Sequence, residues 1–303
     1  MQETVIGIDF GGTKTDVALA DPGGRILRRE RLETEADRGP DQILARTAET
    51  VRQLAKYSCE QVRAQVAGWA AVCPGVVQDD RILLTPNMPG WEHLALADRL
   101  AEEFGVPRVG VDNDVRAGAL AELRFGALAN VHTGIYVSLG TGIAAALTID
   151  GRVHAGAHRA AGEIGYMNPG DASIGAVAAG RAPLEEIVGG RALERKAEAV
   201  LGAPVSGVEL LRRTDPEARR LVQLTLQVLA MSLANLAVFI DPERIVVGGG
   251  MMAAADVILP ALTELVAAAT PFPPEIRAAR FRQDASLHGA IALAVDGLPP
   301  ADD

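Results

Sequence analysis

Apolar positions along the chain form short runs that alternate with stretches of helical spacing. Near the start, the apolar runs 5–8 and 17–19 flank a polar turn that contains Gly11 and Gly12, and this arrangement predicts a β-hairpin. A third strand is predicted for 25–33. The apolar positions between 40 and 57 recur at helical spacing, so a helix that crosses the sheet is expected there.

The same kind of hairpin recurs downstream, where apolar runs at 135–139 and 143–149 flank Gly140-Thr141-Gly142. The chain is therefore predicted to be internally duplicated. Further strands are predicted at 66–72, 109–111 and 244–247, and further helices at 91–104, 117–124, 253–268 and 285–295, with a mainly helical region over 192–239. Alternation of strands and helices indicates α/β domains, and the last helix is expected to pack on the first of them.

Composition bounds the class of protein. With 303 residues, 49% of them hydrophobic, the chain is long enough for two globular domains of about 150 residues each. The formal charge of −10 would repel nucleic acids and anionic membranes, so a small-molecule partner is favoured. The two cysteines, Cys59 and Cys73, are expected to be unpaired, buried and in a reducing compartment. We expect no leader peptide and no membrane span, and hence a soluble cytoplasmic protein.

Both glycine turns have the chemistry of a phosphate site. Backbone N–H groups at Gly11, Gly12 and Thr13 can approach an anionic oxygen, and the Thr13 hydroxyl adds a donor. Asp9, at the end of the first strand, would face a metal ion. An ordinary tight hairpin is the alternative, but the nearby Lys14 and the second Gly-Thr-Gly turn favour phosphate binding.

Ordered motifs connect the chain to a known family. They are IDFGGTK (8–14), PGVV (74–77), NMPGW (87–91), DNDVRAGALAE (112–122), LGTGI (139–143), AGEIGY (161–166), LEEIVGGRAL (184–193) and VVGGGM (246–251). In this order they resemble the ROK family of repressors and sugar kinases. The resemblance implies a two-domain α/β fold of the actin-like ATPase (ribonuclease H-like) type. A smaller domain would comprise 1–117 and 286–303, and a larger, nucleotide-binding domain 118–285. The repressors have a DNA-binding motif before the first hairpin, for which there is no room here, so a kinase is expected.

The resemblance also assigns roles. Asp114 would be the general base that takes the proton from a sugar hydroxyl. The sugar-binding residues would be Gly75, Asn87, Asn113, Asp114, Glu163, Tyr166 and Glu185, and the nucleotide-binding residues Gly11, Gly12, Thr13, Lys14, Thr141, Gly142, Gly249 and Gly250. Asp9 would hold Mg²⁺ through water, the cofactor would be ATP, and the protein would be a homodimer.

Each role has a structural alternative. Asn113 and Asp114 are also typical of a helix cap. Glu163 is equally compatible with an ion pair, and Glu185 and Lys14 with solvated surface positions. Because Glu186 adjoins Glu185, the sequence leaves open which of the two faces the sugar.

The chain departs from the family pattern at Tyr166, where most family kinases have a histidine followed by a zinc-binding cysteine cluster. Residues 167–183 contain neither Cys nor His, so no zinc is predicted and 167–180 should be ordered by packing. In the family, the histidine that Tyr166 replaces contacts the sugar near its anomeric end and C2. Its replacement suggests a modified hexose such as an amino sugar, of the kanosamine type used in antibiotic biosynthesis. Acidic loop residues that could meet its ammonium group are Asp79, Asp80 and Asp171.

The predicted reaction is transfer of the γ-phosphoryl group of Mg-ATP to the 6-hydroxyl of a glucose-like or amino hexose, with domain closure excluding water. Polyphosphate as donor stays open. One rival is a non-catalytic sugar sensor with the same fold. Another is a dinucleotide enzyme, since 140–145 fits a relaxed Gly-x-Gly-x-x-Ala pattern, although a Rossmann turn should open a helix and a strand is predicted here.

Overall fold

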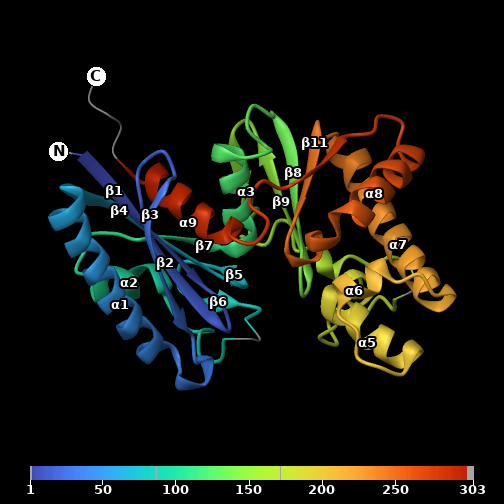
Figure 1. Ribbon diagram of the computed structural model, residues 1–303, viewed down its shortest axis with the longest axis horizontal. Coiled ribbons are helices and arrows are strands. Elements are labelled where there is room, and N and C mark those ends of the chain that lie inside the picture. Colours follow the sequence, from blue (N-terminus) through green and yellow to red (C-terminus); the bar gives the residue numbers. More distant parts are fainter. Residues whose placement is uncertain (1, 86–87, 171, 299–303) are drawn as a thin grey trace. The chain divides into compact units, whose positions relative to one another are not determined.

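A computed structural model describes residues 2–85, 88–170 and 172–298 of the chain. The chain folds into two compact units of nearly equal length (Figure 1): unit 1 comprises Met1–Phe125, Ala155–Ala160 and Asp284–Asp303, and unit 2 comprises Gly126–His154 and Ala161–Gln283. The first division thus falls after Phe125 and not after residue 117, because helix α3 (Asp114–Phe125) is continuous and packs on α9 (Ala285–Asp296) within unit 1. The assignment of 155–160 to unit 1 was not predicted.

Unit 1 is built on a five-stranded sheet of order β3-β2-β1-β4-β7. The predicted hairpin is confirmed, since β1 and β2 are antiparallel and Asp9 lies opposite Asp16. Strand β3 continues the meander, whereas β4 and β7 run parallel to β1. A separate two-stranded sheet is formed by β5 and β6. The bounds are Gln2–Phe10 (β1), Lys14–Ala20 (β2), Ile26–Glu33 (β3), Ala64–Cys73 (β4), Val76–Val77 (β5), Ile82–Leu83 (β6) and Gly110–Asn113 (β7).

Helices cover both faces of this sheet. Apolar side chains of α1 (Pro40–Tyr57) and α2 (Leu96–Phe104) pack on one face, and those of α9 pack on the other. Gly68 permits the close approach of α9, because a Cβ at this position would lie 2.4 Å from the Ala294 carbonyl oxygen. Short helical turns lie at Ala36–Arg38 (η1) and Ser58–Val62 (η2, a π-helical turn).

The helix predicted for 91–104 begins only at Leu96. Trp91 lies instead in the preceding turn, where the Leu94 N–H donates to the Trp91 carbonyl oxygen at 3.1 Å. Its ring is fully buried and meets Phe10 edge-on, with 5.2 Å between the ring centroids. The aromatic contact with β1 thus accounts for the apolar position that suggested a longer helix.

Unit 2 contains a second five-stranded sheet, of order β10-β9-β8-β11-β12. Strands β8 and β9 form the predicted second hairpin, with Leu139 opposite Ile143. Because a strand follows the Gly140 turn, the Rossmann interpretation is wrong. Strand β11 runs parallel to both β8 and β12, and the sequence did not predict β12. The bounds are Thr133–Leu139 (β8), Ile143–Ile149 (β9), Arg152–His154 (β10), Arg244–Gly248 (β11) and Glu275–Ala278 (β12).

The helices of unit 2 bury apolar side chains against β8, β9 and β11. Two of them begin at polar caps: the Ser206 hydroxyl accepts the Glu209 N–H, and the Asp215 carboxylate accepts the Ala218 N–H before the long helix α7. The mainly helical region predicted for 192–239 is confirmed, and it consists of the three helices α5, α6 and α7. The helical segments are Ile164–Tyr166 (η3), Glu185–Val188 (α4), Gly190–Leu201 (α5), Gly207–Arg212 (α6), Pro216–Ile240 (α7), Gly250–Ala254 (η4) and Ala255–Ala269 (α8).

Two helical stretches, Pro216–Ile240 and Gly250–Ala269, are long and apolar enough to cross a membrane by length and composition. Both contribute to the core of unit 2: Leu226, Leu229 and Leu233 of α7 pack with Ile258 and Leu262 of α8. A buried core helix of a globular protein satisfies the same criterion, so the finding is weak evidence for a membrane span.

Candidate active site

The turn of the first hairpin is held by internal hydrogen bonds. The Gly11 N–H donates to the Lys14 carbonyl oxygen at 2.9 Å. Contrary to the sequence-based expectation, this N–H is therefore not a donor for a ligand. The N–H and hydroxyl of Thr34 donate to the carbonyl oxygens of Thr13 and Gly11, at 2.8 and 2.7 Å. In the described part of the chain, the N–H groups of Gly12 and Thr13 have no acceptor. These two groups and the exposed Thr13 hydroxyl are therefore the donors that the turn offers to an anion.

Gly11 is needed for a different reason than the sequence suggested. Neither Gly11 nor Gly12 is among the described glycines with positive φ, so the backbone does not require glycine there. A Cβ on Gly11, however, would lie 2.8 Å from the Lys14 carbonyl oxygen. At Gly11, the tightness of the turn, not a left-handed conformation, excludes a side chain.

Asp9 lies at the carboxyl end of β1, and its side chain is only partly accessible. Burial raises its pKa from 3.8 to about 6, although the Ser286 hydroxyl donates to Asp9 Oδ2 at 2.5 Å and the charge of Arg29 opposes the rise. A bound cation would favour the charged carboxylate in such a place. No group of three or more His, Cys, Asp or Glu that could hold a metal is found among the described residues. A single carboxylate suits Mg²⁺, which keeps several waters and binds phosphate oxygens, so the residues present fit this ion.

A charged cluster beside Asp9 was missed from the sequence. Asp16, opposite Asp9 across the hairpin, accepts hydrogen bonds from Arg29 and Arg31 at 2.7 and 2.9 Å, and Arg29 also pairs with Asp284 at 3.0 Å. Burial alone would raise the pKa of Asp16, but these two arginine hydrogen bonds outweigh it and lower the pKa. The alternating arginines of β3, two residues apart and hence on one face, were the signal for this cluster.

The predicted base lies at the same edge of the sheet. Because β1, β4 and β7 are parallel, Asp9 is level with Val72 and Val72 with Asp112, and Asp114 begins α3 directly after β7. The buried Cys73 thiol reports the proximity of the three carboxylates: burial raises its pKa most, and the charges of Asp114, Asp9 and Asp112 raise it further. Cys73 is thus buried as expected, whereas Cys59 is exposed, contrary to expectation.

Asn113 does cap a helix. Its Oδ1 accepts the Arg116 N–H at 2.7 Å, while Asp114 Oδ1 accepts the Val115 N–H at 2.9 Å. The oxygen of the buried Asn113 amide is therefore committed to α3, which leaves its Nδ2 group as the donor for a ligand. Capping and ligand binding are compatible here, because they use different atoms of one side chain.

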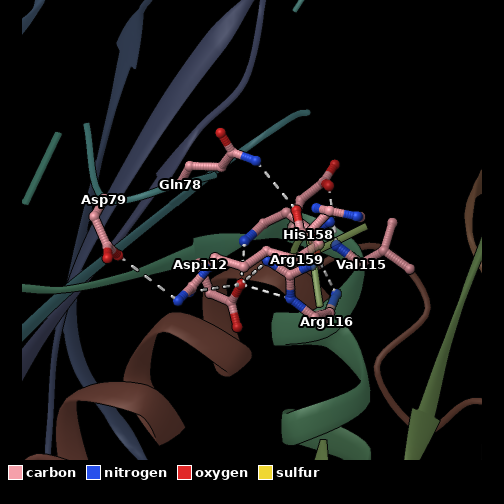
Figure 2. A network of polar contacts seen from close by, with 9 residues as sticks. Gln78, Asp79, Asp112, Val115, Arg116, His158 and Arg159 are labelled. Carbon is pink, nitrogen blue, oxygen red and sulfur yellow. Dashed lines mark hydrogen bonds and ion pairs between the residues drawn. The ribbon is translucent and has the colours of Figure 1, made fainter. Parts of the chain in front are cut away.

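Arg116 joins this junction to a distant segment, as Figure 2 shows. Its side chain is 1% exposed, its Nε donates to Asp112 Oδ1 at 2.7 Å, and another guanidinium nitrogen donates to the Arg159 carbonyl oxygen. The Gln78 amide donates to the His158 carbonyl oxygen at 3.3 Å. These bonds hold 155–160 on unit 1 although the residues on either side belong to unit 2.

Two of the three acidic loop residues considered for an ammonium group, Asp79 and Asp80, are paired with arginines. Arg159 lies 4.0 Å from Asp79 and 3.9 Å from Asp112 (Figure 2), and Arg81 is 2.5 Å from Asp80. Asp171 lies outside the described residues. The two described residues therefore do not support the amino sugar hypothesis.

Of the two predicted loop contacts to the sugar in unit 1, only Gly75 can be assessed. It has φ 98°, and a Cβ there would lie 2.5 Å from the Leu83 carbonyl oxygen, so the turn after β4 requires glycine. Asn87 lies outside the described residues.

The second glycine turn is fixed by its neighbours in unit 2. The Gly140 N–H donates to the Gly142 carbonyl oxygen at 3.0 Å, and the first N–H groups of α5, from Gly190 and Arg191, donate to the carbonyl oxygens of Gly140 and Thr141 at 2.9 and 3.1 Å. In the adjacent loop after β11, Gly249 has φ 92° and lies so close that a Cβ would be 2.4 Å from the Leu139 carbonyl oxygen. The predicted nucleotide residues Thr141, Gly142, Gly249 and Gly250 are thus gathered at the carboxyl ends of β8 and β11.

Three predicted sugar residues of unit 2 also lie together. Burial raises the pKa of Tyr166, and the charges of Glu163 and Glu185 raise it further. Of the two adjacent glutamates, Glu185 lies beside Tyr166, whereas Glu186 pairs with Arg181 at 2.5 Å. Glu185 Oε2 also accepts the Ile143 N–H at 3.1 Å, a contact with the glycine turn that the sequence did not predict.

The segment after Tyr166 is ordered partly by one side chain. Asn168 Oδ1 accepts the N–H groups of Gly170 and Ala172 at 2.8 and 3.2 Å, and its Nδ2 donates to the Ala172 carbonyl oxygen at 2.6 Å. Packing, which we had expected, contributes through the buried Ala176. The hydrogen bonds of Asn168 therefore help to order this segment, in addition to apolar packing.

The motif order suggested a family, and a family model described as the ROK family matches residues 5–296. The chain belongs to the ROK family. It is 30% identical over 297 residues to the N-acetylmannosamine kinase of Salmonella newport (strain SL254), covering 96% of this chain and 98% of that protein.

Solved ROK structures resemble the whole chain. The ROK hexokinase from Thermus thermophilus has 30% sequence identity and a TM-score of 0.79, over 96% of this chain and 97% of its own. A ROK glucokinase from Streptomyces griseus, solved with glucose and AMPPNP, has 27% sequence identity and a TM-score of 0.76. The match covers 97% of this chain and 100% of the glucokinase chain. The expected actin-like ATPase sugar kinase fold is confirmed.

Proposed function

We propose that this ROK protein transfers the γ-phosphoryl group of ATP, as its magnesium complex, to the 6-hydroxyl of a hexose. The observation that carries the proposal is the common sheet edge of unit 1. Parallel pairing of β1, β4 and β7 brings Asp9 and the glycine turn to the same edge as Asn113 and Asp114. The candidate phosphate-binding turn, the candidate metal ligand and the candidate base thus belong to one unit.

In unit 1, Asp114 would accept the proton of the attacking hydroxyl and the Nδ2 group of Asn113 would donate to a neighbouring hydroxyl. Gly12, Thr13 and Lys14 would bind phosphate, with the Gly11 carbonyl held by Thr34 to support the turn. Asp9 would hold Mg²⁺ through water, and the ion supplies neutralisation of phosphate charge. Gly75 and Asn87 would belong to the loops next to the sugar.

In unit 2, Thr141 and Gly142 would bind phosphate, and Gly249 and Gly250 the adenosine. Glu163, Tyr166 and Glu185 would meet the sugar hydroxyls, as carboxylate acceptors and a phenol that both donates and accepts. Residues 167–183 contain neither Cys nor His, so zinc binding is not part of the proposal.

The chain is a sugar kinase, as are its relatives from Salmonella newport, Thermus thermophilus and Streptomyces griseus. We propose a glucose-like or amino hexose as substrate, because Tyr166 replaces a histidine that is usual in the family. The unpaired Cys59 and Cys73 support a reducing, cytoplasmic location.

A coupled ADP-release assay tests the proposal. Glucose, mannose, fructose, glucosamine, kanosamine and N-acetylmannosamine are compared with ATP, and then with polyphosphate, as donor. Phosphorus NMR of the product identifies the phosphorylated hydroxyl. A clear preference for glucose would contradict the amino sugar hypothesis. Sugar binding without ADP release from any hexose would favour the non-catalytic sensor.

We also propose a homodimer, supported by an uncharged stripe on α7. Leu224, Met231 and Val238 are each about half exposed and recur every seven residues, and Phe239 beside them is 88% exposed. Such a stripe is self-complementary in an isologous contact. Light scattering of the wild type and of Met231→Glu tests this proposal: a monomeric wild type would contradict it.

A further inference from the structure

The second glycine turn, Gly140-Thr141-Gly142, is held by hydrogen bonds from backbone N–H groups and by a carboxylate. The N–H groups of Gly190 and Arg191 hold its carbonyl oxygens, and Glu185 Oε2 accepts the N–H of Ile143, the first residue of β9, at 3.1 Å. Glu185 begins α4, and Gly190 begins α5 five residues later, so one short stretch of chain supplies all three contacts.

The carboxylate occupies the space directly against the turn. A Cβ on Gly142 would lie 2.0 Å from Glu185 Oε2, and a Cβ on Gly165 would lie 3.3 Å from the Glu185 Cβ. This side chain explains Gly142, which has no left-handed backbone, whereas a Cβ on Gly165 would first meet the Ile143 carbonyl oxygen, at 3.0 Å. The packing leaves the turn little freedom to shift while Glu185 is in place.

These contacts determine which polar groups of the turn stay available. The Gly140 N–H and the carbonyl oxygens of Gly140, Thr141 and Gly142 are all engaged within unit 2. In the described residues, no acceptor is found for the N–H groups of Thr141 and Gly142. The Thr141 side chain is exposed.

We propose that Glu185 is a positioning residue for the nucleotide-binding turn: by holding the Ile143 N–H and filling the space against Gly142, it presents the N–H groups of Thr141 and Gly142 to phosphate. This inference rests on the proposed function, because it takes ATP as the ligand of the turn. It moves the main effect of Glu185 from the sugar, where the motif places it, to the nucleotide. The same carboxylate lies beside Tyr166, so a sugar contact through its other oxygen remains compatible.

The test separates the two substrates. Glu185→Ala removes the acceptor, Glu185→Gln keeps an amide oxygen that can accept the Ile143 N–H, and Glu186→Gln is the matched control on the same helix. Kinetics are measured against ATP and against the preferred hexose, and Kd for AMPPNP is measured by calorimetry. We expect Glu185→Ala to raise the KM for ATP and the Kd for AMPPNP about tenfold, with less than about a threefold change in the KM for sugar. Glu185→Gln should stay within about threefold of the wild type for ATP.

Amide hydrogen exchange provides a readout that does not depend on activity. In protein without nucleotide, the exchange rate of the Ile143 amide should be higher in Glu185→Ala than in the wild type. In Glu186→Gln this rate should equal that of the wild type. A second test uses the crowding: Gly142→Ala should weaken AMPPNP binding in the wild type but add little to Glu185→Ala, where the carboxylate is gone.

A rise in the KM for sugar with an unchanged KM for ATP would overturn the proposal and leave Glu185 as a sugar ligand only. Additive effects of Gly142→Ala and Glu185→Ala, or unchanged exchange at Ile143, would also overturn it. Failure of the proposed function is distinguishable, since wild type and Glu186→Gln would then both lack ATP-dependent phosphorylation of every hexose.

Discussion

The pKa of Asp9 makes a prediction about stability that follows from its place at the end of β1. Burial raises this pKa from 3.8 to about 6 in the folded protein, whereas the unfolded chain titrates at the ordinary value. The folded state therefore binds the proton more tightly than the unfolded state. Replacing Asp9 by Asn removes the titration while keeping an amide oxygen that can accept the hydrogen bond from Ser286.

The direction of the pH dependence follows from linkage. The stability that protonation of Asp9 confers is fully present below pH 3.8 and is lost as the pH rises through about 6. A rise of roughly two pKa units, at 1.36 kcal/mol per unit, corresponds to about 3 kcal/mol. Without metal, Asp9→Asn should therefore be more stable than the wild type by up to about 3 kcal/mol above pH 7, with the difference vanishing towards pH 4.

Urea unfolding at several pH values, in chelator, measures this difference. Asp16→Asn is the control across the hairpin, because arginine hydrogen bonds outweigh burial and lower the pKa of Asp16. Its effect should have the opposite sign: the variant is less stable at neutral pH, and the deficit shrinks on acidification. A difference between wild type and Asp9→Asn that stays constant from pH 4 to pH 8 would refute the reasoning. Mg²⁺ with ADP should narrow the difference at pH 8 by stabilising only the wild type.

Further predictions concern the base, the buried arginine and the loop after β11. Asp114→Asn should lower kcat by about 10²–10⁴ and retain sugar binding in calorimetry, and unchanged turnover would remove Asp114 as base. Arg116→Met leaves Asp112 without its buried partner and should cost about 3–5 kcal/mol of unfolding free energy in urea titrations, whereas Arg81→Met, which breaks an exposed pair, should leave it nearly unchanged. Gly249→Ala should lower the melting temperature and weaken AMPPNP binding, because its positive φ and the adjacent Leu139 carbonyl oxygen exclude a side chain; wild-type AMPPNP affinity in this variant would contradict its place in the site.

The sequence predicted the elements whose pattern is local. Both hairpins, the helix from Pro40 to Tyr57 and the strand at 244–248 are present, since alternating or helical spacing of apolar residues is read within one segment. The position of Asp9 and Asp114 at strand ends was also predictable, because it follows from where each strand stops.

Long-range pairings were not predictable in this way. Strand β12 is short and half exposed, and it is recognisable only by its pairing with β11. The alternating arginines of β3 indicated that they share a face, but their pairing with Asp16 depends on the register between β2 and β3. The contact of Glu185 with the Gly142 turn joins positions more than forty residues apart. What a local pattern does not contain is the register between distant segments, and these contacts depend on that register.

The charge around Tyr166 bears on the choice of sugar. A phenol whose pKa is raised above its ordinary value by burial, Glu163 and Glu185 is neutral at physiological pH. A histidine beside two carboxylates would instead be drawn towards its protonated form. With tyrosine, the two glutamates keep more of their negative charge for the ligand. An ammonium group on a hexose could offset that charge, whereas the acidic loop residues Asp79 and Asp80 are already matched by arginines. If the substrate is an amino sugar, its recognition should therefore depend mainly on Glu163, because Glu185 is engaged by the Ile143 N–H, and not on Asp79 or Asp80.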